Sequence, residues 1–172
     1  LLSLERIKRM GFAVHGHGEW SPDGKKILMI IGKSLSELNI YLLDIETDTL
    51  EQLTDREGIN TDPSWSPDGQ EILFIGCPET KKCKENQHEI YSIPVSARKA
   101  KDAKRLTNDK VSANDVYVSP DGKRAAWLHL KGWVPLSLET FISDYSKENG
   151  ITNIKSCKGG LTNWMPDSSG LL

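Results

Sequence analysis

Short apolar runs separated by polar turns recur along the chain, and each run has the length of a β-strand rather than of a helix. The clearest run, 26–31, is apolar almost throughout, which is typical of a strand buried on both faces. A second run at 39–45 and a more polar one at 50–54 follow it, with a reversing turn at 46–49. Together with a short strand that ends at Trp20, these runs predict a unit of four strands whose polarity rises outward.

The same order of runs appears in two further units. The first three units span approximately 15–55, 60–108 and 113–157, and residues 161–172 begin a fourth. Polar, lysine-rich insertions at 76–88 and 96–103 are predicted to be surface loops of the second unit. Residues 1–14 suit either a short helix or an outer strand of a preceding unit, and we expect the strand.

A five-residue motif marks each unit. Trp-Ser-Pro-Asp-Gly occupies 20–24 and 65–69, Val replaces its Trp at 118–122, and 164–168 is a degenerate copy. Proline presets φ, aspartate tolerates the next turn position, and glycine leaves the turn with φ > 0, so the motif predicts a hairpin. The prolines, at 22, 67, 120 and 166, are 45, 53 and 46 residues apart, which is the period of propeller blades.

The sequence therefore predicts one all-β domain over 1–172, a β-propeller of four-stranded antiparallel blades with three full blades and part of a fourth. An open arc of blades leaves its two terminal sheet faces bare. Three arrangements would cover them: residues 1–10 pairing with the hairpin at Trp164, the joining of arcs from two chains as a homo-oligomer, or further blades if the sequence is part of a longer protein.

Composition narrows the choice of partners. A net charge of −2 with interspersed signs provides no basic face for nucleic acid, and the longest apolar run is too short for membrane insertion. Cys77 and Cys83 flank a short loop, a spacing that allows a small disulfide in an oxidising compartment or two free thiols. Cys157 has no evident partner, and no zinc-ligand pattern is complete.

Strand order predicts which end of the propeller carries ligand-binding residues. The segments that lead into the inner strands share one mouth with the loops between second and third strands, whereas the Pro-Asp-Gly turns lie on the opposite face. Polar residues at that mouth are the predicted ligand-binding set, and the aspartates of the turns are predicted to be structural. The set comprises His15, His17, Asn60, Asp62, Asp115 and Trp133.

Aromatic residues separate into two groups. Trp20, Trp65 and Trp164 precede the turns and are predicted to pack between blades, while Trp133, in a loop at the mouth, is the candidate for ligand stacking.

Two histidines could bind a metal. His15 and His17 are two residues apart, so on an extended strand their side chains leave the same face, and two imidazoles plus a carboxylate can hold a divalent ion. His88 and His129 are predicted at strand ends that face the same mouth. The alternative interpretation is that the His-Gly-His-Gly stretch is a solvated approach to the strand whose glycines permit close packing.

The motif, followed by an apolar strand, an Ile-Tyr strand and a closing Leu-Thr, resembles the TolB-type propeller repeat over nearly the whole chain. The resemblance implies a periplasmic or extracellular location, which agrees with the Cys77/Cys83 spacing. The stretch 15–24 is also similar to the His-x-His segment of oligogalacturonate lyases, in which such histidines bind manganese. Val118 and the third strand of the third unit depart from the repeat.

Three functions follow from these observations. We expect a non-catalytic TolB-like propeller that binds a protein or peptide partner at the mouth, because the scaffold is intact and no catalytic motif is present. The alternatives are a manganese-dependent lyase acting on acidic oligosaccharides, and the propeller domain of a prolyl-oligopeptidase-like serine peptidase. The peptidase would require a hydrolase domain beyond Leu172, because the chain has no Gly-x-Ser-x-Gly motif.

Overall fold

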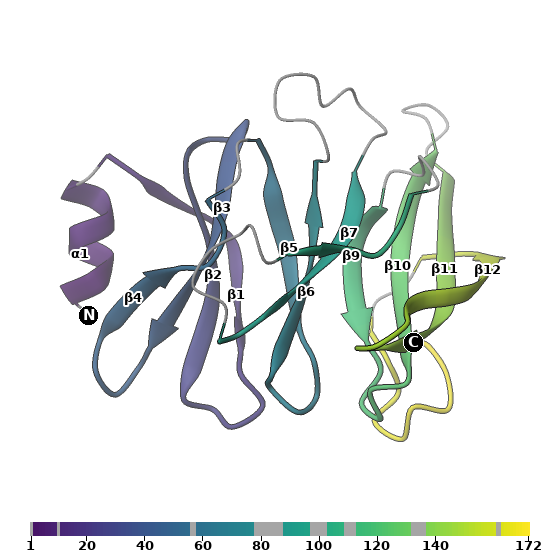
Figure 1. Cartoon of the computed structure of the whole chain (residues 1–172). Helices are drawn as coiled ribbons and strands as arrows, with labels where there is room; N and C mark the ends of the chain where they lie inside the picture. The colour runs from purple at the N-terminus through teal and green to yellow at the C-terminus, as the bar shows by residue number, and fades with distance from the viewer. Residues whose placement is uncertain are drawn as a thin grey trace.

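A computed structural model describes residues 2–9, 11–55, 58–77, 88–96, 103–108, 113–131, 137–160 and 163–172. Its strands form three four-stranded antiparallel sheets, in each of which the strands lie in the order that they have along the chain. The sheets stand side by side in a row from the first to the third (Figure 1). The predicted architecture, consecutive blades of a partial propeller, is confirmed.

The strand bounds agree closely with the predicted units. The first blade consists of β1 (Ala13–Trp20), β2 (Lys26–Ser34), β3 (Glu37–Asp44) and β4 (Thr49–Gln52). The second consists of β5 (Asn60–Trp65), β6 (Glu71–Gly76), β7 (Glu89–Pro94) and β8 (Lys104–Arg105). The third consists of β9 (Ala113–Val118), β10 (Arg124–Lys131), β11 (Ser137–Ser146) and β12 (Gly150–Lys158). We call β1, β5 and β9 the inner strands.

The N-terminal segment is a helix, α1 (Leu2–Arg9), so the prediction of an outer strand there is wrong. Leucine, glutamate, arginine and lysine, which fill this segment, are strong helix formers. Ile7 of the helix is buried against Met29, Ile31 and Leu43 on one face of the first blade. The helix thus lies beside the first sheet, at the end of the row (Figure 1), and packs on apolar side chains of that sheet.

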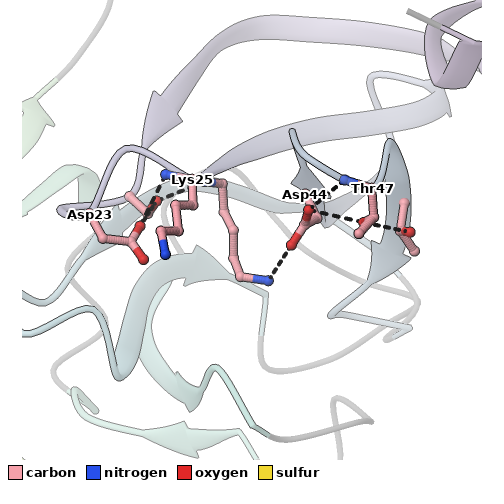
Figure 2. Close-up of polar contacts among 7 residues, drawn as sticks. Asp23, Lys25, Asp44 and Thr47 are labelled. Atoms are coloured by element: carbon pink, nitrogen blue, oxygen red, sulfur yellow. Dashed lines mark hydrogen bonds and ion pairs between the residues drawn. The ribbon is translucent and has the colours of Figure 1, made fainter.

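Each Pro-Asp-Gly turn is held by the same hydrogen bonds. In the first blade the Ser21 hydroxyl donates to Asp23 Oδ1 (2.6 Å) and accepts the N–H of Lys26 (2.9 Å). Asp23 Oδ1 also accepts the N–H of Lys25 at 3.1 Å (Figure 2). The second and third turns repeat these bonds, so the predicted structural role of the turn aspartates is confirmed.

The four turns lie on one side of the molecule and touch one another. A Cβ added to Gly69 would lie 3.7 Å from Pro22 Cδ, and one added to Gly122 would lie 3.9 Å from Pro67 Cδ. In the fourth copy Ser168, at the position of these glycines, accepts the N–H of Asp121 at 3.0 Å. The turns of successive blades therefore stack from proline to glycine, as a shared propeller axis requires.

Alternate residues of each second strand serve opposite faces of the blade. In β6, Ile72 and Phe74 pack toward the first blade, whereas Leu73 and Ile75 pack toward the third. The equivalent residues of β2 divide in the same way, because Met29 and Ile31 face α1 whereas Leu28 faces the second blade. In β10, Ala125 and Trp127 face the second blade, and Ala126 and Leu128 face the fourth unit. The side-chain period of two in a strand explains how one apolar run supplies two interfaces.

Tryptophan indoles connect neighbouring blades. Trp65 Nε1–H donates to the carbonyl oxygen of Glu19 at 3.2 Å, and Trp164 Nε1–H donates to that of Tyr117 at 3.3 Å. Both tryptophans are buried, so their predicted packing between blades is confirmed. The same prediction is wrong for Trp20, because 57% of this residue is exposed.

The third blade has Val118 where the other blades have tryptophan, and a different polar contact crosses its interface. The hydroxyl of Tyr145 in β11 donates to Glu71 Oε2 in β6. Both residues are buried, and burial followed by the Glu71 hydrogen bond raises the pKa of Tyr145. This contact joins the second and third blades in place of the absent indole.

The Gly69→Ala variant tests the backbone requirement of the turns. Gly69 has φ of 67°, a conformation that costs a residue with a side chain about 1–2 kcal/mol, and there is room for the added methyl group. Alanine also lowers the conformational entropy of the unfolded chain, which offsets a smaller part of this cost. We therefore expect a net loss of about 1 kcal/mol in the free energy of unfolding, measured by urea denaturation. Gly170→Ala, at a glycine without positive φ, is the control, and an equal loss there would contradict the explanation.

The Tyr145→Phe variant tests the contact between the second and third blades. Removing the hydroxyl leaves Glu71 Oε2 buried without its donor, so we expect a loss of about 1–3 kcal/mol in the free energy of unfolding. Tyr41→Phe is the matched control, because Tyr41 is half-buried and its hydroxyl makes no hydrogen bond to another described residue. Similar effects of the two variants would show that the Tyr145 hydroxyl does not stabilise the interface.

Candidate functional site

The inner strands converge on one cavity, which we call the inner-strand cavity. It has a volume of about 280 Å³, and all three blades and the fourth unit contribute to it. Its lining residues, among those described, are Gly16, Gly18 and Glu19 from β1, Asp62 and Pro63 from β5, Asp115, Val116 and Tyr117 from β9, Ile30 from β2, and Asn163. A cavity at the axis of a repeat protein, reached by every inner strand, is the natural candidate for ligand binding.

The segments that lead into the inner strands lie at the same end of the blades as the starts of the third strands. The N–H of Leu38, at the start of β3, donates to the carbonyl oxygen of Gly58, in the segment that leads into β5. In the same way the N–H of Ala113, at the start of β9, donates to the carbonyl oxygen of His88. Because the Pro-Asp-Gly turns end the inner strands, they lie at the opposite end from these contacts.

Bulges in the inner strands position two aspartates. The register between β5 and β6 shifts between Thr61 and Ser64, and a corresponding shift interrupts the pairing of β9 with β10. Asp62 and Asp115 occupy these irregular positions with φ of 46° and 48°. Aspartate tolerates this left-handed conformation better than most residues do. Since bulges re-aim side chains, the repeated bulge explains why both aspartates line the cavity.

The cavity is electrostatically negative around Tyr117. Burial raises the pKa of Tyr117, and the carboxylates of Asp115, Asp62 and Glu19 raise it further. These three acids therefore lie within electrostatic reach of one phenol.

Glu19 is the most perturbed acid of the cavity. Burial raises its pKa to about 7, and the N–H of Trp65, which donates to Glu19 Oε1 at 3.3 Å, opposes this shift in part. Near neutral pH the side chain is consequently divided between its charged and neutral forms.

The structure brings together only some of the residues predicted to bind a ligand. Asp62 and Asp115 share the cavity. Asn60 is instead in the interior, where its side chain donates to the carbonyl oxygen of Leu38 (3.1 Å) and to Asn39 Oδ1 (3.2 Å). The side chain of His17 and the whole of Trp133 lie outside the described residues.

The histidines are not part of the cavity lining among the described residues. His15 pairs with Ile30 in the first blade, and its Nε2 is buried without a hydrogen-bond partner in the described part of the chain. His129 pairs with Ala113, whose N–H donates to the carbonyl oxygen of His88, so both histidines lie at the end of the blades where β9 begins. Burial lowers the pKa of His88.

The manganese site implied by the His-x-His segment stays a prediction, because the side chain of His17 lies outside the described residues. Among them, no group of three or more histidine, cysteine, aspartate or glutamate side chains could hold a metal ion.

Sequence reasoning missed Glu19, Tyr117 and Asn163 as cavity residues. All three lie three residues before a motif proline, at 22, 120 and 166, so the repeat itself carried the signal. Ser64 has the same position in the second blade but is buried.

Two further findings concern the environment of the protein. Cys77 is disulfide-bonded, whereas Cys157 is a free and exposed thiol, and Cys83 lies outside the described residues. None of the described helices has the length and apolar character needed to cross a membrane.

Comparison with solved structures supports the fold. TolB from Acinetobacter baumannii is 28% identical, with a TM-score of 0.66 over 91% of this chain and 36% of that one. A proposed TolB from Agrobacterium tumefaciens is 25% identical, with a TM-score of 0.63 over 84% of this chain and 48% of that one. The chain thus spans less than half the length of either structure.

A more distant structure shows the fold alone. The β-propeller domain of the Trilobed protease from Pyrococcus furiosus is 16% identical, with a TM-score of 0.61 over 85% of this chain and 43% of that one. No curated protein matches the sequence. The family model described as the TolB beta propeller domain matches residues 8–160, which is most of the chain, and the protein therefore belongs to the TolB β-propeller family.

Proposed function

We propose that this propeller binds an extended, positively charged segment of a protein or peptide partner in the inner-strand cavity. The observation that carries the proposal is the convergence of Glu19, Asp62 and Asp115, from three blades, on one hollow at the axis. A lysine or arginine side chain, or an amino terminus, has the charge that these acids would attract.

The size of the cavity supports a segment rather than a small metabolite. Its volume of about 280 Å³ is at the lower limit of the ~300–1,000 Å³ of pockets that enclose drug-sized ligands. A cavity of this size accommodates one long side chain, while the rest of a partner would contact the surrounding mouth.

The scaffold supports binding without large rearrangement. Asp62 and Asp115 are held by bulges in strands whose neighbours are buried, so their side chains are positioned before any partner arrives. Preorganised carboxylates lose less entropy on binding than flexible surface acids do.

The two alternative functions remain predictions. Negative charge around Tyr117 would repel an acidic oligosaccharide, which does not favour a lyase acting at this cavity. For the serine-peptidase alternative the comparison shows the fold alone, since the propeller domain of the Trilobed protease is 16% identical.

We also propose a periplasmic or extracellular location. The disulfide bond of Cys77 supports it, because disulfides persist in oxidising compartments and are rare in the cytosol. The family to which the chain belongs is consistent with this location.

Charge removal in the cavity tests the proposed function. The probe is a fluorescent, terminally capped peptide of alternating lysine and alanine, with a glutamate-alanine peptide as its negative counterpart. We expect the Asp62→Asn, Asp115→Asn double variant to bind the lysine peptide about tenfold more weakly, a loss of about 1.4 kcal/mol, as measured by fluorescence anisotropy at fixed ionic strength.

The control removes the same charge elsewhere. Glu46 and Glu51 are exposed at the outer edge of the first blade, so the Glu46→Gln, Glu51→Gln variant should bind the lysine peptide as the wild type does. Equal weakening by both variants would indicate a net-charge effect and would refute binding in the cavity.

Glu19 makes the binding depend on pH. Because its pKa is about 7, raising the pH from 6 to 8 converts the neutral acid to a carboxylate, and the affinity for the lysine peptide should rise over that interval. The Glu19→Gln variant should lose most of this rise, since an amide does not titrate there. Anisotropy titrations at several pH values measure the effect, and an unchanged pH profile in the variant would exclude Glu19 from the site.

A further inference from the structure

The first and third blades carry a basic residue opposite an acidic one where the second strand begins and the third strand ends. In the first blade Lys26 pairs with Asp44, and Lys26 Nζ lies 3.0 Å from Asp44 Oδ2. In the third blade Arg124 pairs with Asp144. Each base comes four residues after the motif proline, so the two pairs occupy one position of the repeat.

The second blade has an acid at this position and no base opposite it. Glu71 pairs with Pro94, whose ring offers no hydrogen-bond donor. Glu71 is 9% exposed, and among the described residues only the Tyr145 hydroxyl donates to its side chain, at Oε2. The other oxygen, Oε1, is not fully buried and accepts no hydrogen bond from the described part of the chain. A largely buried carboxylate is costly without a compensating charge, so this position favours a cation supplied by a ligand.

A groove of about 680 Å³ opens beside Glu71. Residues of the second blade and of the turn between β11 and β12 line it, so it lies between two described blades and not at an end of the row. Its described lining, besides Glu71, includes Gln70, Pro94, Val95, Ser96 and Lys147. None of the described residues that line the inner-strand cavity also lines this groove.

Lys147 lines the groove but does not supply the missing charge. Its Nζ donates to Asp68 Oδ2 at 2.5 Å and to Gln70 Oε1 at 3.3 Å. Because Asp68 balances the charge of Lys147, the Glu71 carboxylate leaves the groove with a net negative charge.

A guanidinium group matches these side chains better than an ammonium group does. It presents five N–H donors in a planar fork, while Glu71, the Gln70 amide oxygen and the Ser96 hydroxyl are acceptors. It is also more weakly hydrated than an ammonium group, so it loses less on entering a partly buried site. Pro94 and Val95 provide apolar surface for an attached aliphatic chain.

We propose that the groove between the second and third blades is a second binding site, which takes the guanidinium group of a free compound or of an arginine side chain in a polypeptide. Glu71 pairs with the cation, and Gln70 and Ser96 accept its remaining N–H groups. The site is independent of the inner-strand cavity and of the function proposed for it.

Nuclear magnetic resonance titrations of the ¹⁵N-labelled protein test this site. The probe is Nα-acetyl-arginine amide, which should produce saturable shifts of the backbone amides of Gln70, Glu71 and Ser96. The citrulline analogue, in which an uncharged urea replaces the guanidinium group, should produce none. The lysine analogue should bind about threefold or more weakly, and equal binding of it would overturn the choice of guanidinium.

Two matched variants isolate the charge of Glu71. Glu71→Gln keeps an acceptor for the Tyr145 hydroxyl and should weaken binding of the arginine probe about tenfold or more, because an amide does not attract the cation. Glu148→Gln removes the same charge from an exposed residue of the turn between β11 and β12, outside the described groove lining, and should bind as the wild type does. Equal weakening by both variants, or none in Glu71→Gln, would overturn the proposal.

Ser96→Arg decides the question if Glu71→Gln fails to fold. Ser96 is an exposed lining residue, so an arginine there can place its own guanidinium group beside Glu71 and exclude the probe. We expect about tenfold weaker binding, since the tethered group has a high effective concentration. Ser96→Gln, with a long but neutral side chain, should bind as the wild type does. Wild-type affinity in Ser96→Arg would contradict the site.

Two further titrations separate this site from the inner-strand cavity and identify the source of the ligand. The Asp62→Asn, Asp115→Asn variant should retain the shifts at Gln70 and Glu71, and their loss would refute a separate site. Tighter binding of a capped Ala-Arg-Ala peptide than of the arginine probe would assign the guanidinium group to a polypeptide. Equal binding of the two would assign it to a free compound.

Discussion

Burial of each sheet face against its neighbour is the interaction on which the rest of the molecule depends. The apolar second strand of each blade supplies both faces, and four clusters of buried side chains follow one another along the row, from α1 to the fourth unit. Removing this apolar surface from water stabilises the folded protein by about 25 cal/mol per Å² of buried area. A single blade would expose both faces, so no blade of this kind is expected to be stable alone.

Polar contacts between blades are less uniform than the apolar packing. Two interfaces carry a tryptophan N–H bonded to a main-chain carbonyl group, at Trp65 and Trp164. The third blade has Val118 instead, and there the buried pair of Tyr145 and Glu71 crosses the interface. A buried carboxylate without a donor would be costly, so these two residues depend on each other. The repeat therefore tolerates the loss of a motif residue when another polar contact joins the same two sheets.

The packing between blades does not require regular pairing of the inner strands, so these strands can position residues of a binding site. Their backbones pair with buried strands on one side only, and each contains an irregularity that interrupts the regular pairing. At these irregularities Asp62 and Asp115 adopt positive φ and line the cavity, while Glu19 loses enough water to raise its pKa. Strained residues and perturbed acids occur together at functional sites more often than elsewhere, and here both occur at the axis.

The sequence by itself determined the blades, because strand alternation, turn chemistry and a regular repeat are local patterns that each unit states independently. It also placed Asp62 and Asp115 at the same end of the blades, since equivalent residues of a repeat occupy equivalent places. Only the tertiary structure decided that residues 2–9 form α1, because the residues of this segment favour a helix whereas the units that follow it are strands. Only the tertiary structure also showed that hydrogen bonds to Leu38 and Asn39 hold Asn60 away from the cavity. The raised pKa of Glu19 and the exposure of Trp20 depend on which groups lie next to them in neighbouring units. Those neighbours are decided only when separate units pack together.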